Sequence, residues 1–272
     1  MADPKSILLH IDGTARCVER VRVARQLAET FSAEVKALYA VTPSLLRYPM
    51  ALEGGVVSGG DMAIIDDECR DQAHAAYTAA SAGSPLLSWA EPTGDTRDFA
   101  NQALYCDLML LGQRDPDDKS SVYIPPDFLT ALLVQTGRPA LVLPYAGSIA
   151  PIGRTVLVAW KPTPEAARAV SAALPWLRRA EHVHVISYGD SPDKALQAQQ
   201  QYLQAHGVAA QLHRGGPELG KAGEDLLSRA ADLSADLLVM GCYGHSRARE
   251  WVLGGATRTV LQSMTLPVLM AH

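Results

Sequence analysis

The chain repeats itself, and this repeat restricts its possible folds more than any other feature of the sequence. Cys106-Asp-Leu-Met-Leu-Leu-Gly112 matches Ala235-Asp-Leu-Leu-Val-Met-Gly241 at an offset of 129 residues. Near the start of each copy, Ile7-Leu8-Leu9 matches Val156-Leu157-Val158 at an offset of 149. Self-similarity of this kind predicts two units of the same fold.

The length of 272 residues suits two domains of about 130 residues each. We expect domains at residues 1–146 and 152–272, joined by the small-residue linker Tyr145–Pro151. The two offsets differ by 20 (149 minus 129) because the first copy is longer. We place the extra residues in the glycine-rich stretch 42–66.

Each copy alternates apolar segments of strand length with segments of helical periodicity, such as Ala166–Leu177. Continuous apolar strands separated by helices predict a parallel sheet covered on both faces. The fold class is therefore α/β, with two tandem, doubly wound, five-stranded Rossmann-like domains. The expected strands are Ser6–Ile11, Glu34–Val41, Leu87–Glu91, Asp107–Gly112 and Ala140–Pro144, then Thr155–Trp160, His182–Tyr188, Ala209–Arg214, Asp236–Gly241 and Pro267–Ala271.

Composition and charge exclude several classes of protein. Hydrophobic residues make up 48% and charged residues 19% of the chain, which is a globular composition. No apolar run approaches the roughly 20 residues that span a bilayer, and the first residues do not resemble a signal peptide. The four cysteines are scattered without a Cys-x-x-Cys pair, which favours reduced thiols in the cytoplasm.

The charge differs between the halves. Residues 1–150 hold 12 Lys/Arg and 19 Asp/Glu, a net charge of −7, whereas residues 151–272 hold 12 and 10, a net charge of +2. The overall charge of −5 argues against nucleic acid as the partner. A bound anion is favoured in the second half.

A glycine-rich segment follows the fourth strand of the second copy. Gly241, Gly244 and Gly254 have the spacing Gly-x2-Gly-x9-Gly and precede an apolar, helix-compatible run. Backbone N–H groups at the start of that helix favour an anion such as phosphate. The alternative is that these glycines only close a tight turn and begin a helix.

This segment, together with the strand–helix order of both copies, resembles the universal stress protein family in its tandem form. The family motif is Gly-x2-Gly-x9-Gly followed by Ser or Thr. The resemblance implies that the final strands of the two copies pair, which would make the chain a pseudo-dimer. It also implies ATP bound with Mg²⁺ in the second domain, on Gly241, Gly244, His245, Ser246, Arg247, Gly254, Gly255, Ala256, Thr257 and Lys161.

The second copy departs from the family pattern at two positions. Gly255 stands where the motif has Ser or Thr, with Thr257 two residues later. Lys161 stands where nucleotide-binding relatives have an Asp beside the adenosine. A lysine reaches a phosphate but cannot accept a hydrogen bond as a carboxylate does. Trp160, which precedes it, either stacks on a base or packs in the core, and packing is the preferred interpretation.

The first copy departs in the opposite way. It keeps Asp12 after its first strand, but Asp115 replaces the second glycine of the motif and Pro125-Pro126 replace the third position and its neighbour. Prolines lack the N–H groups that a phosphate needs, and carboxylates repel it. We predict that no ATP binds at this loop, and we interpret its aspartates as a solvated surface rather than a metal site.

Three other patterns are interpreted as structural. Gly215–Ala222 nearly spells a phosphate-binding P-loop, but Ala222 lacks the hydroxyl that would bind Mg²⁺. His182 and His184 share one face of a strand near His213, yet no ligand set for zinc is completed, so we predict no metal. Cys242 is expected to be partly exposed near arginines, and a redox role for it is a hypothesis beside that of a filler thiol.

The resulting expectation is a cytoplasmic stress-response protein that binds an adenine nucleotide and regulates an unknown protein partner. It would associate with neither nucleic acid nor membrane, and the resemblance is compatible with a homodimer. No catalytic triad or carboxylate pair is visible, so dedicated catalysis is not expected, although slow ATP hydrolysis is compatible with the resemblance. The alternatives are a scaffold of the same fold that binds no nucleotide, and a P-loop enzyme that uses Gly215–Lys221.

Overall fold

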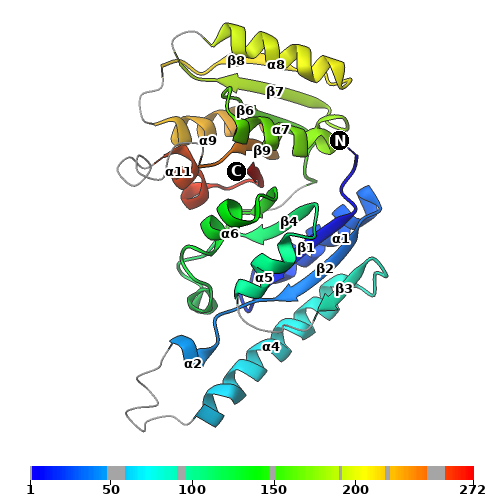
Figure 1. Ribbon diagram of the computed structural model, residues 1–272, viewed down its shortest axis with the longest axis vertical. Coiled ribbons are helices and arrows are strands. Elements are labelled where there is room, and N and C mark those ends of the chain that lie inside the picture. The colour runs from blue at the N-terminus through cyan, green and yellow to red at the C-terminus, as the bar shows by residue number, and fades with distance from the viewer. Residues whose placement is uncertain are drawn as a thin grey trace. The chain divides into compact units, whose positions relative to one another are not determined.

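The computed structural model describes residues 2–47, 59–90, 96–147, 151–189, 192–217, 221–243 and 255–272. It divides into two compact units, of which one is Pro4–Thr136 and the other joins Gly137–His272 with Met1–Asp3 (Figure 1). We call them the N-terminal unit and the C-terminal unit. Their secondary structure confirms the α/β class.

The N-terminal unit contains a parallel sheet in the order β3-β2-β1-β4. Five of the six residues of the first strand are buried, which agrees with a strand covered on both faces. The strand order reverses between β1 and β4, so a switch point lies between their carboxyl ends. The strands are β1 (Ser6–Ile11), β2 (Glu34–Tyr39), β3 (Leu87–Ala90) and β4 (Leu108–Gly112).

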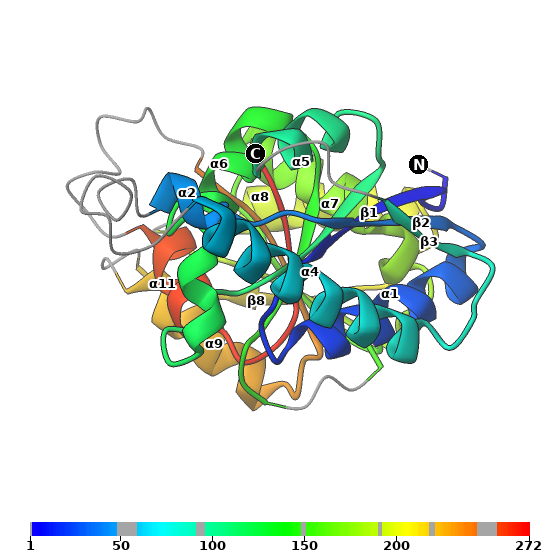
Figure 2. The same ribbon diagram turned by 90° about the horizontal axis from the view of Figure 1, so that it is seen from below.

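Helices cover both faces of this sheet. Figure 2 shows α5 and α6 on one side of strands β1–β3 and α1, which packs beside α4, on the other. The buried residues of α1 recur at helical spacing, and the helix ends at Ser32, whose φ of 48° is left-handed. The helices are α1 (Cys17–Phe31), α2 (Ser44–Arg47), α4 (Gly59–Ser81), α5 (Thr96–Ala103), the 3₁₀ helix η1 (Lys119–Tyr123) and α6 (Phe128–Thr136).

The C-terminal unit contains a sheet in the order β5-β10-β9-β6-β7-β8. All of its pairings are parallel except that of β5 with β10, in which Leu141 lies opposite Leu269. The expected pairing between the final strands of the two copies is therefore confirmed. The strands are β5 (Ala140–Leu143), β6 (Thr155–Ala159), β7 (His182–Ser187), β8 (Gln211–Arg214), β9 (Leu237–Gly241) and β10 (Val268–Ala271).

The helices of the C-terminal unit are α7 (Pro164–Leu177), α8 (Asp193–Ala205), α9 (Ala222–Asp232) and α11 (Ala256–Ser263). Helix α7 begins where the Thr163 side chain accepts the N–H group of Ala166, and Pro164 occupies its first position. Helices α9 and α11 lie side by side (Figure 1), and Gly223 lets α9 approach Ala256 and Thr259 of α11 closely.

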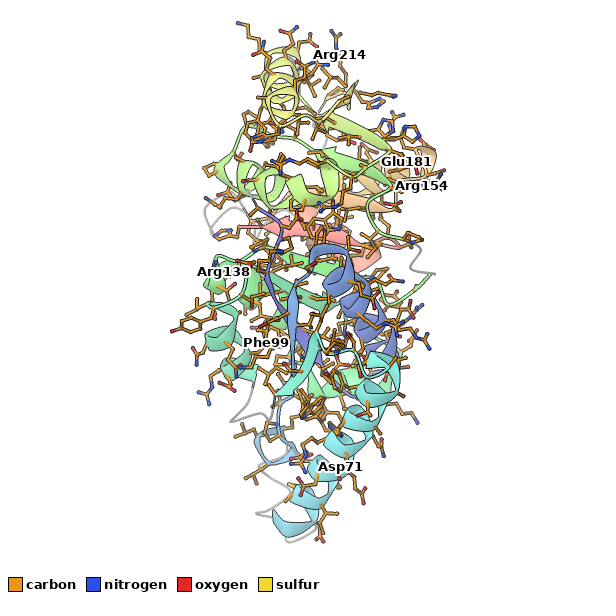
Figure 3. The ribbon with its side chains drawn as sticks, turned by 90° about the vertical axis from the view of Figure 1, so that its right-hand side faces the viewer. Asp71, Phe99, Arg138, Arg154, Glu181 and Arg214 are labelled. Carbon is orange, nitrogen blue, oxygen red and sulfur yellow. The ribbon has the colours of Figure 1, made fainter. Side chains whose placement is uncertain are left out.

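An ion pair joins the entrances of two neighbouring strands of this unit. Arg154 precedes β6 and Glu181 precedes β7, and their side chains lie beside one another in Figure 3, with Nε and Oε2 2.7 Å apart. Both side chains are more than half exposed. Exposed pairs of this kind contribute about 0–1 kcal/mol, so this pair adds little to the stability of the sheet.

The sequence and the structure differ at the boundary between the repeats. The small-residue linker lies after β5. The boundary between the compact units lies before β5, between Thr136 and Gly137, because β5 pairs with β10. The bounds 1–146 and 152–272 describe the repeats and remain a proposal.

Of the glycine-rich stretch 42–66, residues 44–47 and 59–66 are helical, and residues 48–58 lie outside the described part. Among the described residues, no helix is both long and apolar enough to cross a bilayer.

Candidate functional site

The switch point of the C-terminal unit lies between β6 and β9, which pair in parallel with Ala159 opposite Met240. Ligands of doubly wound sheets bind beyond the carboxyl ends of strands at this position. Lys161 follows β6 there, and Gly241 is the last residue of β9. Helix α11 returns from this edge toward the start of β10, so its N-terminus lies at the same edge. The structure thus brings Lys161, Gly241 and Gly255–Thr257 to one edge of one sheet.

Gly241 is required by packing. A Cβ atom at this position would lie 2.5 Å from the backbone nitrogen of Ala166 and 2.8 Å from the carbonyl carbon of Glu165. Both atoms belong to the first turn of α7, whose backbone cannot move away easily. The first glycine of the motif therefore has a structural reason that involves no ligand.

Among the described residues, no side chain caps the N-terminus of α11. Gly255 precedes the helix in an extended conformation, with φ −64° and ψ 159°, and makes no side-chain capping hydrogen bond. The first N–H groups of a helix need acceptors from outside the helix, and phosphate oxygens suit them. Thr257 in this turn is buried. Of the other predicted residues, Gly244, His245, Ser246, Arg247 and Gly254 lie outside the described part of the chain.

Trp160 and Lys161 leave β6 toward this edge. The backbone N–H group of Trp160 donates to the carbonyl oxygen of Ile186 at 2.8 Å, which extends the strand pairing by one residue. Its indole Nε1 is shielded from solvent and has no hydrogen-bond partner among the described residues, although the residue as a whole is half-buried. Lys161 is exposed. This edge therefore carries a cation and a partly exposed aromatic ring.

The corresponding edge of the N-terminal unit is closed by buried polar groups. Asp12 follows β1 and is 2% exposed. Its Oδ1 accepts the N–H and the hydroxyl of Thr14 at 2.9 and 2.5 Å, and its Oδ2 lies 2.5 Å from Nη2 of Arg20 and 3.5 Å from Nδ1 of His10. Burial alone would raise the pKa of the Asp12 carboxyl, but Arg20 and His10 hold that pKa below its usual value. Both oxygens are therefore already in use.

His10 is the aromatic part of this cluster. Its Nε2 lies 2.8 Å from the carbonyl oxygen of Ala40, and its ring contacts Phe99 and Phe128 at centroid distances of 5.4 and 4.6 Å. Phe99, labelled in Figure 3, is completely buried. Burial lowers the pKa of His10 to about 4, although Asp12 opposes the shift. His10 is therefore neutral at pH 7.

The space beside this cluster is too small for a nucleotide. A cavity of about 30 Å³ opens there, lined by His10, Asp12, Thr14, Ser121, Pro125 and Phe128 among others. A water molecule needs roughly 10–15 Å³ measured in this way, so the cavity has room for water only. The hydroxyl of Ser121, which is 1% exposed, has no partner among the described residues and faces this cavity. That the first copy binds no ATP stays a prediction.

The aspartates of the first-copy loop shape its backbone. Asp115 accepts the N–H group of Asp117 at 2.9 Å. Asp118 caps the 3₁₀ helix η1 by accepting the N–H group of Ser120 at 2.8 Å, and it also accepts that of Ala15 at 2.9 Å. These are local turn and cap hydrogen bonds of the kind that Asp side chains commonly make.

The P-loop-like segment has its own structural explanation. A Cβ atom on Gly215 would lie 2.5 to 2.7 Å from the ring of Tyr188, and Gly216 has a φ of +83° that favours glycine. Lys221 is exposed and precedes α9. Residues 218–220 lie outside the described part. The two described glycines thus serve a turn packed against Tyr188.

The histidines of the second copy form a pair. Nδ1 of His184 and Nε2 of His213 lie 3.0 Å apart on neighbouring strands, so one ring donates to the other. Burial lowers the pKa of both rings, helped at His184 by His213 and at His213 by Arg229. In the part of the chain that the structure describes, no three His, Cys, Asp or Glu side chains are placed to hold a metal ion.

The expected partial exposure of Cys242 is wrong. The residue is 1% exposed because it extends β9, and its N–H group donates to the carbonyl oxygen of Ala271 at 2.9 Å. Cys242 directly follows the buried strand β9 and still pairs with β10, so it remains inside the sheet. The sequence pattern alone did not show this pairing.

Sequence reasoning missed Arg20, His10 and Ser121. Arg20 lies on the buried stripe of α1, between Cys17 and Ala24. A charged residue at a core position of a helix requires a buried partner, and this signal was available. His10 also lies inside an apolar strand. Ser121 carries no comparable signal, because η1 brings it to the cavity only in the folded chain.

These features describe two α/β units of similar strand order, in which buried polar groups fill the strand-end edge of the N-terminal unit and Lys161 lies exposed at that of the C-terminal unit. The model of the universal stress protein family matches residues 153–272. A segment of 51 residues is 43% identical to universal stress protein Slr1230 from Synechocystis sp. and covers 19% of this chain and 18% of that protein. The match thus spans less than a fifth of the length of this curated relative.

Two solved structures are similar over nearly the whole chain. One is a universal stress protein from Archaeoglobus fulgidus, with a TM-score of 0.73 and 14% identity, covering 99% of this chain and 96% of that one. The other is a putative universal stress protein from Pseudomonas aeruginosa UCBPP-PA14, with a TM-score of 0.56 and 18% identity, covering 98% and 93%. These likenesses show the fold of both halves. The C-terminal half of the chain, residues 153–272, matches the universal stress protein family.

Proposed function

We propose that this protein binds an adenine nucleotide in its C-terminal unit and regulates a partner protein in response. The observation that carries the proposal is the shared edge of β6 and β9. Exposed Lys161 and the start of α11, which no described side chain caps, lie there beyond neighbouring strands. The N–H groups at Gly255–Thr257 and the Lys161 ammonium would bind the phosphates. Residues 241–259 add Arg247, Arg249 and Arg258 against Glu250, a net charge of +2.

ATP is the proposed ligand, and Mg²⁺ would accompany it. The described part of this edge offers no cluster of carboxylates for a metal ion, so the phosphate oxygens would supply its ligands. Glu165, the nearest acidic side chain of α7, is paired with Arg168 at 3.4 Å. Bound nucleotide would hold residues 241–257 against its phosphates and so change the surface that a partner reads. The four cysteines are free thiols, in agreement with a reducing compartment such as the cytoplasm.

Isothermal titration calorimetry of the full chain with ATP tests this proposal. Lys161→Ala is expected to weaken ATP binding by about 10- to 150-fold, since one charge-assisted hydrogen bond contributes about 1.5–3 kcal/mol. Lys221→Ala is the matched control, because Lys221 is also an exposed lysine of this unit but belongs to the P-loop-like segment. Gly244→Asp, which places a carboxylate in the glycine motif, is expected to abolish binding.

Absence of binding at millimolar ATP would reject the proposal. Equal losses in Lys161→Ala and Lys221→Ala would reject the assigned site, and loss in Lys221→Ala alone would favour the P-loop enzyme.

A scaffold that binds no nucleotide is the second candidate. It is favoured by Gly241, whose absent side chain is explained by the backbone of α7 alone. It is also favoured by Lys161, which replaces a hydrogen-bond acceptor with a donor. Under this alternative, Gly244→Asp and the parent chain give the same flat titration.

A further inference from the structure

The N-terminal unit contains a buried ion pair at the strand end that corresponds to the exposed Lys161 of the C-terminal unit. Arg20 of α1 is 3% exposed and lies 2.5 Å from the 2%-exposed Asp12. The two opposite charges cancel, so the cluster is neutral while both side chains are present. Removing two charges from water is costly, and only close pairing compensates for it.

Arg20 also fills the space above the last residue of β4. A Cβ atom on Gly112 would lie 2.9 Å from Cζ and 3.2 Å from Cδ of Arg20, so the side chain runs along the bare glycine backbone. Gly112 is the residue that the repeat aligns with Gly241 at an offset of 129. The strand-end glycine of the first copy is therefore covered by a side chain, whereas Gly241 is covered by the backbone of α7.

The second copy lacks both members of the pair. At the offset of 149, Lys161 stands at the position of Asp12 and Ala169 at that of Arg20. Ala169 is completely buried and carries no charge. The carboxylate and the guanidinium are thus both present in the first copy and both absent from the second. This is expected if each charge needs the opposite charge as its buried partner.

We propose that the side chain of Arg20 is the resident occupant of the strand-end site of the N-terminal unit. It satisfies Asp12, covers Gly112 and excludes external ligands from this half of the chain. The site is therefore shaped for a guanidinium group, and that is the chemistry it accepts when Arg20 is shortened. This inference concerns the other half of the chain and does not depend on nucleotide binding at Lys161.

Chemical rescue tests the proposal. In full-length Arg20→Ala, the melting temperature is expected to fall by about 10 °C because Asp12 loses its partner. Added millimolar methylguanidinium is expected to raise it again in a saturable manner, whereas methylammonium at the same ionic strength does not. Arg22→Ala is the matched control, because Arg22 is an exposed arginine on the same helix. The parent and this control are expected to show no response.

The proposal is overturned if Arg20→Ala has the same melting temperature as Arg22→Ala. It is also overturned if methylguanidinium and methylammonium raise the melting temperature of Arg20→Ala equally. A neutral double variant, Asp12→Asn with Arg20→Met, covers the case in which Arg20→Ala does not fold. This variant leaves no unpaired charge in the core, so it is expected to fold. Its melting temperature is expected to lie above that of either single variant and not to change with added methylguanidinium. A double variant that melts below both singles would also overturn the proposal.

Discussion

Asp236 accepts the backbone N–H group of Gly153 at 2.7 Å, and it accepts those of Arg154 and Thr155 at 3.1 and 3.2 Å. The side chain thereby ties the start of β6 to the start of β9. Asp107, its counterpart in the first copy, accepts the N–H groups of Lys5 and Ser6 at 2.8 and 3.1 Å. The aspartate shared by the two repeated segments thus has the same structural role in both, at the edge opposite the candidate site.

Asp236→Ala is expected to lower the free energy of unfolding by about 2 kcal/mol, because several backbone donors lose their acceptor. Urea denaturation followed by circular dichroism measures the loss. Asp232→Ala, on the exposed face of α9, is the control and should change stability by no more than about 0.5 kcal/mol. Equal stabilities of the two variants would contradict the role assigned to Asp236.

Stability is expected to fall between pH 7 and pH 5 because of His10. Burial lowers its pKa from 6.5 to about 4. The unfolded chain therefore binds a proton in this interval that the folded chain does not, so acid favours unfolding. The loss from this group between pH 7 and pH 5 is about 2 kcal/mol, at 1.36 kcal/mol per pH unit below 6.5. Urea denaturation at pH 7, 6 and 5 measures it.

His10→Gln is the matched variant for this measurement, because glutamine keeps a side-chain donor for Ala40 but does not titrate in this range. Its stability should depend less on pH than that of the parent. The remaining dependence is assigned to His184 and His213, whose pKa values burial also lowers. An unchanged pH dependence in His10→Gln would exclude His10 as the source.

The native chain is expected to expose one cysteine to alkylation. Cys69 of α4 is half-buried, whereas Cys17, Cys106 and Cys242 are 2%, 4% and 1% exposed. Iodoacetamide followed by mass spectrometry should label Cys69 first and all four residues only in denaturant. Burial and the carboxylates Asp66 and Glu68 raise the pKa of Cys69, so its labelling should accelerate above pH 9. Fast labelling of Cys242 in the native chain would contradict the structure.

Gly241→Ala is expected to destabilise the ligand-free protein by about 1–3 kcal/mol, because the added methyl group meets the backbone of α7. Differential scanning calorimetry without nucleotide measures the change. Gly13→Ala is the control, since a Cβ atom there makes only ordinary contacts with Ser120, at 3.7 Å and beyond. If Gly241→Ala has the same melting temperature as the parent, the packing explanation for this glycine is wrong.

The sequence alone was sufficient for the architecture. Apolar segments such as Ser6–Ile11 and Asp236–Gly241 predicted the strands to within about two residues, because a strand buried on both faces has few polar positions. The repeated Asp-Leu-x-x-x-Gly segments and the apolar segments of the first strands identified the duplication, and the pairing of β5 with β10 agrees with it. The lysine at position 161 and the two prolines of the first loop were also visible in the sequence.

Only the tertiary structure decided what happens at the two strand-end edges. Asp12 and Arg20 are eight positions apart in the sequence, and each alone is compatible with binding a ligand. In the folded chain they neutralise one another and cover Gly112, which arrives from a distant strand. In the same way Gly241 ends a predicted strand and Cys242 follows it, but their surroundings depend on α7 and β10. Local sequence determines which residues reach an edge, whereas the contacts made across the sheet determine which of them remain available.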